Sequence, residues 1–297
     1  LKARGVPSPD VQISAKISAH AIQTGIARVD GVRNIIAVAS GKGGVGKSTT
    51  AVNLALALHA EGARVGLLDA DIYGPSVPLL LGVSVKPASL DGKKMIPIQG
   101  HGLQANSIGF LMNDDTPAIW RGPMVVQALE QLLRQTAWDD LDYLIIDMPP
   151  GTGDIALTLS QSVPVVGAVI VTTPQDLALI DARKGLKMFE KVNVPILGIV
   201  ENMALHICSQ CGHAEPIFGQ GGAQRMATDF KAPWLGSLPL ALAIREQADA
   251  GQPIVVSHPQ SEAAALYREI ALRLAGRVAT LPKDMSEKFG AISIKRV

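Results

Sequence analysis

Short apolar runs alternate with longer segments of helical periodicity along most of this 297-residue chain. Strands are predicted at residues 35–39, 65–68, 103–108, 143–146, 168–171, 196–200 and 235–238. Helices are predicted at residues 48–60, 124–135, about 176–191 and 261–275. Because strands that alternate with helices form βαβ units, the pattern predicts an α/β fold with a mostly parallel, twisted sheet between two layers of helices.

The two ends of the chain depart from this pattern. Residues 11–22 alternate in part between apolar and polar side chains, as a half-buried strand would. We expect residues 1–30 to be a linker or the remnant of an upstream domain, and residues 31–282 to form the main domain. Residues 283–297 are expected to be a mildly basic C-terminal tail.

The overall charge and hydropathy pattern argues against two classes of partner. The formal net charge is +1, which gives no global reason to expect binding to nucleic acid or an acidic membrane. The longest apolar run, residues 163–171, is far shorter than the ~20 residues that a membrane-spanning helix needs. No signal peptide is visible. We therefore expect neither nucleic acid nor a membrane as partner.

The first predicted strand and helix enclose a glycine-rich loop that satisfies the pattern G-x-x-x-x-G-K-[ST]. Glycines let backbone N–H groups turn toward phosphate oxygens, and the N-terminus of the following helix adds its positive dipole end. Lys47 is expected to reach the β- and γ-phosphates of ATP, and the Ser48 hydroxyl to ligate Mg²⁺. The predicted nucleotide contacts in this loop are Gly41, Lys42, Gly43, Gly44, Val45, Gly46, Lys47, Ser48 and Thr49.

A second lysine, Lys42, follows the first glycine of the loop. With it, the loop closely resembles the deviant Walker A loop of the MinD-like ATPases. In that group the extra lysine reaches across a dimer interface to the nucleotide of the partner. The resemblance therefore implies that Lys42 acts in catalysis together with Lys47, and that two copies of the chain meet.

Three aspartates follow predicted strands. Asp69 and Asp71 close the strand at 65–68, and Asp147 closes the strand at 143–146 in the manner of a Walker B motif. The MinD-like pattern implies that Asp71 positions the attacking water or acts as general base, and that Asp69 supports the Mg²⁺ shell. Asp147 is expected to hold Mg²⁺ through water. The proline- and glycine-rich residues 148–154 suit a switch that senses the γ-phosphate.

Two later segments are candidates for the nucleotide base. Asn202 ends the strand at 196–200, and a side-chain amide both donates and accepts hydrogen bonds, which suits the edge of adenine. In the MinD-like group an asparagine at this place contacts the base. Residues 238–240, with Pro239, resemble the loop that flanks the base in that group.

The two cysteines, Cys208 and Cys211, form a C-x-x-C motif that suits metal or redox chemistry in a reducing compartment, so we expect a cytoplasmic protein. A cubane cluster needs four thiolates, so two chains would have to meet. Zinc could use the cysteines with His206 and His213, or with the cysteines of a second chain. A thiol–disulfide pair would need a lowered cysteine pKa. The spacing alone leaves these chemistries open.

Taken together, the sequence blocks closely resemble the Mrp/ApbC iron–sulfur cluster carrier proteins. The blocks are residues 41–50, 69–76, 120–123, 147–154, 173–176, 201–203 with Cys208 and Cys211, and 217–219. The resemblance implies a P-loop NTPase of the MinD or SIMIBI type that hydrolyses ATP to ADP and phosphate with Mg²⁺. It implies a homodimer that binds a 4Fe–4S cluster between its subunits through Cys208 and Cys211, and passes it to apoproteins.

The same resemblance has consequences for partners and for domain organisation. It implies that apo iron–sulfur client proteins and cluster assembly scaffolds are partners. It also implies that residues 1–30 hold only the last strands of a MIP18-like domain, which bacterial members often carry.

Two other functions compete with the cluster carrier. A positioning ATPase of the MinD or ParA type, with a structural zinc knuckle, would need a basic stripe or an amphipathic basic tail. The tail has Lys283, Lys288, Lys295 and Arg296 but no clear apolar face. An electron-transferring ATPase like the nitrogenase iron protein places its cluster cysteines at two separated positions, whereas both cysteines here fall in one knuckle.

Overall fold

The computed structural model describes residues 16–89, 92–112, 122–208 and 210–285. Its main sheet has the strand order β10-β7-β6-β1-β5-β2-β4-β3, and β3 alone is antiparallel to its neighbour among these described strands. The strands are β1 (Val32–Ala39), β2 (Val65–Asp69), β3 (Ile98–Gly100), β4 (Leu103–Ser107), β5 (Leu141–Asp147), β6 (Gly167–Thr172), β7 (Ile196–Glu201) and β10 (Trp234–Ser237).

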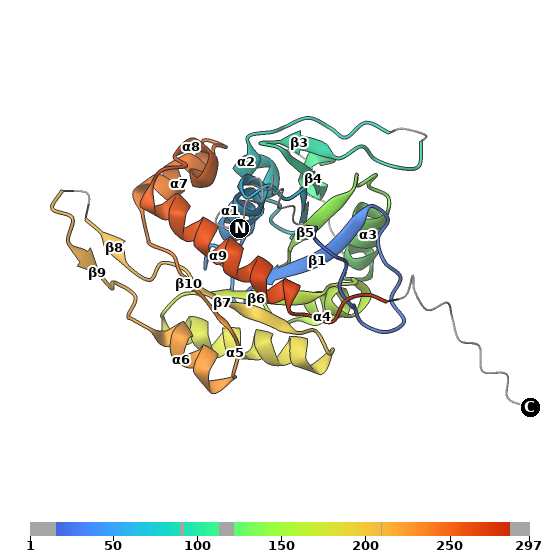
Figure 1. The fold of residues 1–297 in the computed structure, drawn as a ribbon. Helices are drawn as coiled ribbons and strands as arrows, with labels where there is room; N and C mark the ends of the chain where they lie inside the picture. Colours follow the sequence, from blue (N-terminus) through green and yellow to red (C-terminus); the bar gives the residue numbers. More distant parts are fainter. Residues whose placement is uncertain (1–15, 90–91, 113–121, 209, 286–297) are drawn as a thin grey trace, which may run out of the picture.

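Helices cover both faces of the sheet, which makes three layers (Figure 1). One face carries α1 (Lys47–Ala60), α2 (Val77–Leu81), α7 (Leu242–Asp249), α8 (Ile254–Ser257) and α9 (Glu262–Ala279). The other carries α3 (Gly122–Arg134), α4 (Asp154–Ser162), α5 (Asp176–Lys191) and α6 (Gly222–Asp229). The predicted α/β architecture with a mostly parallel sheet is therefore confirmed.

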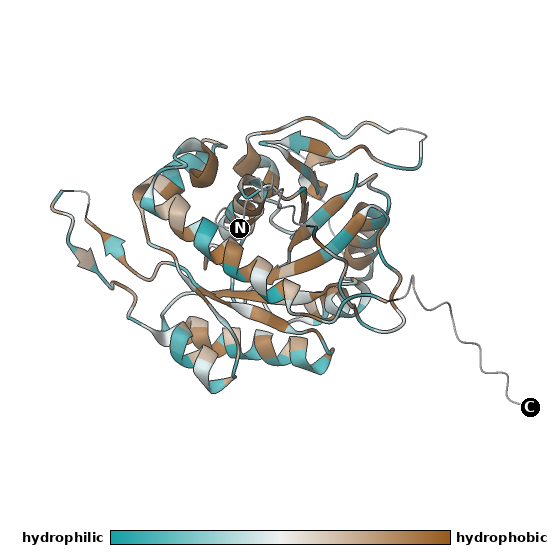
Figure 2. Ribbon diagram, in the orientation of Figure 1, coloured by the Kyte–Doolittle hydropathy of each residue, from teal (hydrophilic) through white to brown (hydrophobic). Residues whose placement is uncertain are grey.

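The central strand β1 shows why the sheet needs both layers. Ile36 and Val38 pack into the core beneath α1, whereas Ile35 and Ala37 pack into the core on the opposite face. Successive side chains of a strand point to opposite faces, so a strand that is apolar throughout is buried on both sides. Figure 2 shows this as hydrophobic strands enclosed by helices whose outer surfaces are hydrophilic.

Every predicted strand and helix of the main domain is present, with small shifts at the ends. The strand expected at 103–108 ends at Ser107, because Ile108 begins the short 3₁₀ helix η2 (Ile108–Phe110). The pattern missed β3, the two short strands at His206–Ile207 and Ala214–Glu215, and the helices α2, α4, α6, α7 and α8. The last four begin without a hydrogen bond from a capping side chain, so the usual start signal is missing from the sequence.

The expectation of a half-buried strand over residues 11–22 is wrong for its described part, residues 16–22. Only His20 there pairs, through an isolated antiparallel bridge to Lys283. Ile17 and Ile22 pack against the core, so the alternation reflects two buried side chains without a hydrogen-bonded ladder. Residues 11–15 lie outside the described residues.

The two ends of the described chain lie against each other. The Ala21 amide donates to the Pro282 carbonyl at 2.8 Å, the Asp284 amide donates to the Ala19 carbonyl at 3.0 Å, and Arg28 Nε lies 2.7 Å from Asp284 Oδ2. The domain boundaries near residues 30 and 282 stay predictions. Residues 286–297, which include Lys288, Lys295 and Arg296, lie outside the described residues, as do residues 120 and 121 of the block at 120–123.

A small hairpin projects from the body of the molecule, made of β8 (His206–Ile207) and β9 (Ala214–Glu215) (Figure 1). Its two strands pair only with each other as a sheet, in antiparallel register. The hairpin carries the C-x-x-C motif. Across the described ranges, every helix is too short or too polar to cross a bilayer.

Candidate functional site

Two of the predicted aspartates and the glycine-rich loop meet at one edge of the sheet, where parallel strands end. Asp69 ends β2 and Asp147 ends β5, and the two residues are register partners across these neighbouring strands. Asp147 is also the register partner of Val38, shortly before the glycine-rich loop that follows β1. Ligands of open α/β sheets bind at this edge, so the topology brings the loop and the carboxylates to one place.

The loop at 40–46 has the conformation that its glycines predict. Gly44 and Gly46 have φ values of +80° and +78°, in the left-handed region that side chains other than glycine rarely adopt. A Cβ added at Gly44 would meet nothing within 4 Å, so this residue faces open space. The amide of Gly151, in the predicted switch, donates to the Ser40 carbonyl at 2.9 Å and ties that segment to the loop.

Helix α1 follows the loop and starts at Lys47 without a capping hydrogen bond from a side chain. Its first N–H groups are therefore available to an anion, as expected for a phosphate site. Lys42 and Gly43 are exposed on the loop, whereas Ser48 and Thr49 are half-buried in the first turn of α1. Val45 is buried, so it contributes its backbone and not its side chain to the loop surface.

Lys47 is buried and points at the carboxylates. Its Nζ lies 2.5 Å from Asp147 Oδ1, 3.3 Å from Ser48 Oγ and 4.0 Å from Asp71 Oδ2. The sequence predicts that this ammonium reaches phosphates, and here it is paired with Asp147. Burial raises the pKa of Asp147 although Lys47 favours its ionised form.

Asp147 also holds an unpaired atom. Its Oδ2 is buried and has no hydrogen-bond partner among the described residues. Buried polar atoms are normally satisfied, so an orphaned carboxylate oxygen beside a phosphate loop marks a place for a further polar group. The Ser48 hydroxyl lies 3.3 Å from the same Lys47 Nζ that contacts Asp147 Oδ1. These oxygens suit Mg²⁺, which prefers hard oxygen ligands and keeps several waters.

Asp69 accepts hydrogen bonds on both of its carboxylate oxygens. Its Oδ1 accepts from the Asp71 amide at 3.1 Å. Its Oδ2 accepts from the amides of Ser76 and Val77 at 3.0 and 3.1 Å, and from Ser107 Oγ at 3.0 Å. Burial raises the pKa of Asp69 to about 7 against these hydrogen bonds. Both oxygens are thus engaged in holding the segment after β2, and support of the Mg²⁺ shell by Asp69 stays a prediction.

Asp71 is the second carboxylate near Lys47, with its Oδ2 4.0 Å from the Lys47 Nζ. It is half-buried, and burial raises the pKa of its carboxyl while the Lys47 ammonium lowers it. A partly accessible carboxylate close to the lysine of a phosphate loop is suited to hold a water molecule. The structure thus brings Asp71, Lys47 and Asp147 together, as the sequence predicted.

Asn202 lies directly against the phosphate loop. Its Nδ2 donates to the Val45 carbonyl at 2.9 Å, and a Cβ added at Gly46 would lie 2.2 Å from the same nitrogen. The expected contact with adenine stays a prediction. One N–H of the amide is already used by the loop in this structure, a contact that the motif did not indicate.

Pro239 lies in the wall of a cavity of 420 Å³ between the segment after β7 and the start of α9. The lining is mostly apolar and includes Ala204, Leu205, Ile207 and Leu266. A flat, apolar group such as a nucleotide base would suit such a wall, so the expectation for Pro239 also stays a prediction.

The hairpin presents both cysteines near its tip, as free thiols. Cys208 is half-buried and Cys211 is exposed. The Cys208 amide donates to the His213 carbonyl and the Gly212 amide to the Cys208 carbonyl, both at 2.9 Å. Backbone N–H groups of residues 210 and 211 point at the Cys208 sulfur and lower its pKa. The turn therefore favours a thiolate, the form that binds metal.

A metal site within one chain is incomplete in the described residues. These residues contain no group of three or more His, Cys, Asp or Glu side chains placed to hold a metal ion. His206 Nδ1 lies 3.2 Å from the Leu240 carbonyl, so this ring nitrogen is already engaged. Any ion or cluster on Cys208 and Cys211 needs further ligands from beyond this set.

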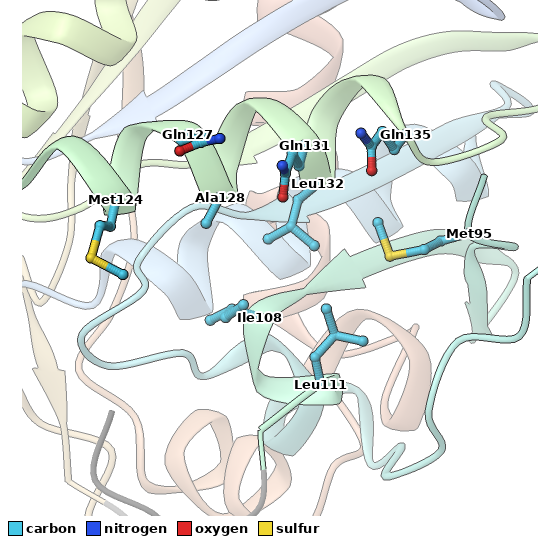
Figure 3. Close-up of a pocket in the computed structure, with 9 residues that line it drawn as sticks. All are labelled: Met95, Ile108, Leu111, Met124, Gln127, Ala128, Gln131, Leu132 and Gln135. Carbon is cyan, nitrogen blue, oxygen red and sulfur yellow. The ribbon is translucent and has the colours of Figure 1, made fainter. Parts of the chain in front are cut away.

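A separate cavity of 370 Å³ lies between α3 and the segment around β4 (Figure 3). Gln127 and Gln131 come from α3 and Gln135 directly follows it, and Met95, Ile108 and Leu111 line the opposite side. None of the predicted site residues lines this cavity. Its described wall carries no charged side chain that could bind a phosphate.

Comparisons with known proteins agree with this geometry. A family model described as ParA, NUBPL iron-transfer P-loop NTPase, matches residues 31–275. The "Iron-sulfur cluster carrier protein" of Salmonella typhimurium is 64% identical over 251 residues, covering 84% of this chain and 68% of that protein. Its namesake from Pseudomonas fragi is 60% identical over 270 residues, covering 90% and 94%. The mouse "Iron-sulfur cluster transfer protein NUBPL" is 51% identical over 257 residues, covering 86% and 81%.

Solved structures resemble the fold as well. A nucleotide-binding protein from Archaeoglobus fulgidus, in complex with ADP, shares 37% identity at a TM-score of 0.70, covering 81% of this chain and 94% of that one. The cell division ATPase MinD of Pyrococcus furiosus shares 24% identity at a TM-score of 0.61, covering 82% and 98%, and this likeness concerns the fold alone.

Proposed function

We propose that ATP turnover at the edge of the sheet governs an iron–sulfur cluster held by Cys208 and Cys211. The chain itself belongs to the ParA family of NUBPL-type iron-transfer P-loop NTPases. The family predicted from the sequence is confirmed. The positioning-ATPase alternative has less support, because relatives at 60–64% identity are named cluster carriers, whereas the MinD structure shares 24% identity.

One observation carries the proposal. The hairpin with the two free cysteines leaves β7 directly beside the phosphate loop, with Asn202 touching the loop six residues before Cys208. In a positioning ATPase the thiolates at this place would serve only a structural zinc knuckle. A cluster carrier whose cargo is controlled by nucleotide needs both features close together.

The loop residues bind and orient ATP in this proposal. The N–H groups at 41–49 cradle the phosphates, and Lys47 turns from Asp147 to the β- and γ-phosphates when they arrive. Ser48 and the free oxygen of Asp147 would hold Mg²⁺, which neutralises charge on the phosphate oxygens. Pro239 and the oxygen of Asn202 are proposed to contact the base.

Asp71 and Lys42 are proposed to act on the reaction itself. Asp71 orients a water molecule toward the γ-phosphorus, so that a new P–O bond forms as the bond to ADP breaks and phosphate leaves. Lys42 is exposed on the loop surface, where it could reach the phosphates of a second copy. Asp69 supports both by fixing the segment that carries Asp71.

The cargo is proposed to be a 4Fe–4S cluster shared by two copies. Each chain offers two thiolates and the cluster needs four, so Cys208 and Cys211 of both subunits would close the site. Zinc at the same four sulfurs is the competing occupant. Apo iron–sulfur proteins are the proposed recipients and assembly scaffolds the source. Free thiols suit a reducing compartment such as the cytoplasm.

Anaerobic reconstitution with iron and sulfide tests this function. The wild-type chain should gain a broad absorbance band in the visible blue, and should lose it to an apo-acceptor protein. The Cys208→Ala/Cys211→Ala variant should gain none while it still binds ATP. Retention of the band by this variant would refute the assigned ligands. A wild-type chain that takes up no iron would refute the carrier function.

A further inference from the structure

The segment that leads from β7 to the cysteine hairpin is packed against the phosphate loop without a gap. Asn202 Nδ2 donates to the Val45 carbonyl at 2.9 Å. A Cβ added at Gly46 would lie 2.2 Å from that nitrogen and 3.7 Å from Met203 Cε. Gly46 has no side chain that could hold Asn202 away from the loop, so the peptide between Val45 and Gly46 cannot turn without displacing the Asn202 side chain.

The next residue, Met203, has an uncommon backbone conformation. Its φ is +56°, in the left-handed region that side chains other than glycine rarely adopt. Such a conformation persists only where the surroundings fix it. Here the Asn202 amide donates to the Thr172 carbonyl at 2.7 Å, and the Ala204 amide donates to the Leu238 carbonyl at 3.0 Å. Hydrogen bonds on both sides therefore hold the turn.

After the turn, the chain stays attached to a second segment at the nucleotide end of the sheet. The Leu240 amide donates to the Leu205 carbonyl at 2.8 Å, and His206 and Leu240 form a parallel bridge. His206 Nδ1 lies 3.2 Å from the Leu240 carbonyl, which can only accept, so this nitrogen donates. The neck of the hairpin, residues 202–206, is thus hydrogen-bonded to neighbouring segments before and after the Met203 turn.

The chain that returns from the hairpin to α6 is attached close to the point where the hairpin begins. The Ala223 amide at the start of α6 donates to Glu201 Oε1 at 3.0 Å, and Glu201 is buried at the end of β7. Between these anchors the hairpin pairs only with itself as a sheet. A small rotation at the Asn202–Met203 turn would therefore be carried outward to the cysteines (Figure 1).

We propose that the Asn202–Met203 turn transmits the state of the phosphate loop to Cys208 and Cys211, with Asn202 as the positioning residue. Phosphates draw the loop N–H groups toward themselves, which reorients the Val45–Gly46 peptide and its bond to Asn202. The neck then turns, and the cysteines of two copies either face one another or separate. This inference rests on the proposed function and adds the path by which nucleotide reaches the cargo site.

Hydrogen exchange of residues 206–215, measured on the full chain without cluster, tests the path. In the wild type, a non-hydrolysable ATP analogue with Mg²⁺ should change the exchange rate of this hairpin about threefold or more relative to Mg·ADP. The Asn202→Asp variant keeps the size of the side chain but sets a carboxylate against the Val45 carbonyl. Its hairpin should exchange at one rate with both nucleotides.

Two further variants control the test. Asn193→Asp makes the same chemical change at an exposed asparagine after α5 and should keep the wild-type response. Met203→Gly keeps the Asn202 side chain and accepts the positive φ but loosens the turn, so its response should fall to less than about half. This variant decides the question if Asn202→Asp loses nucleotide affinity, which is measured separately with a fluorescent ATP analogue.

A full nucleotide response in a nucleotide-binding Asn202→Asp chain, or in Met203→Gly, would overturn the inference. So would a wild-type hairpin that binds nucleotide and shows no response. Failure of the carrier function would give a different result from failure of this path. Iron uptake would be absent on reconstitution, while the nucleotide response of the hairpin remained.

Discussion

The Nζ of Lys47 lies 2.5 Å from Oδ1 of Asp147, and neither side chain has appreciable access to solvent. An ammonium and a carboxylate that are both buried depend on each other, because each would otherwise be an uncompensated charge. The pair holds the phosphate loop in position before any nucleotide arrives. It also keeps the lysine within reach of the place where phosphates would enter.

The first prediction concerns this pair. Asp147→Ala leaves the Lys47 ammonium buried without its main partner, so the free energy of unfolding should fall by about 3–5 kcal/mol. Asp30→Ala removes a carboxylate that is 96% exposed and 3.8 Å from Lys94, and should cost about 0–1 kcal/mol. Chemical denaturation of the nucleotide-free chain compares the two. Equal losses would show that the buried pair is not the stabilising contact.

The second prediction follows from the pKa of Asp69. That pKa is raised to about 7 from an ordinary value of 3.8, so the folded chain binds the proton more tightly than the unfolded chain. The associated stability is present below pH about 4 and is lost as the pH rises through about 7. The melting temperature of the nucleotide-free protein should fall from pH 5 to pH 8.

Ser107→Ala provides a control for this titration. It removes a hydrogen bond that favours the ionised carboxylate of Asp69, so the window of falling stability should move to higher pH. A melting temperature that rises over this range, or a profile unchanged by Ser107→Ala, would speak against a raised pKa.

The third prediction distinguishes two effects of replacing a glycine of the phosphate loop by alanine: the steric clash of the added Cβ and the cost of a positive φ. Gly46→Ala places a Cβ 2.2 Å from Asn202 Nδ2 and requires alanine to keep a φ of +78°. Affinity for ATP should fall at least about tenfold, which is about 1.4 kcal/mol. Gly62→Ala has a similar φ of +93° but meets nothing within 4 Å, and should bind ATP as the wild type does. Isothermal titration distinguishes these outcomes.

The fourth prediction concerns the exposed Lys42. Lys42→Ala should change the free energy of unfolding by no more than about 0.5 kcal/mol, because the side chain lies on the surface. ATP turnover should nevertheless fall at least about tenfold, if the lysine acts on the phosphates of a second copy. Lys187→Ala, on the exposed side of α5, should leave turnover unchanged. Normal turnover by Lys42→Ala would remove the lysine from catalysis.

The main architecture could be predicted because parallel strands that are buried on both faces consist of short runs of apolar residues in the sequence. Lys47, Asp71 and Asp147 could be predicted to meet because each follows a strand, and the carboxyl ends of parallel strands share one edge. Short helices such as α6 and α7 left little signal, because their packing against the body decides their conformation.

Contacts that depend on tertiary approach could not be predicted in the same way. Nothing in the sequence places the Asn202 amide on the Val45 carbonyl, or gives Met203 a left-handed backbone. The same holds for Ser107, which reaches Asp69 only because β4 pairs with β2. In each case the residue type permits the contact, and the packing of neighbouring elements selects it.

Native mass spectrometry of the anaerobically reconstituted chain tests the central claim most directly. The account predicts a dimer whose added mass corresponds to about four iron and four sulfide ions, with no such species in the Cys208→Ala/Cys211→Ala variant. A monomer that carries iron, or a dimer that carries only zinc under the same conditions, would contradict a 4Fe–4S cluster shared between two copies.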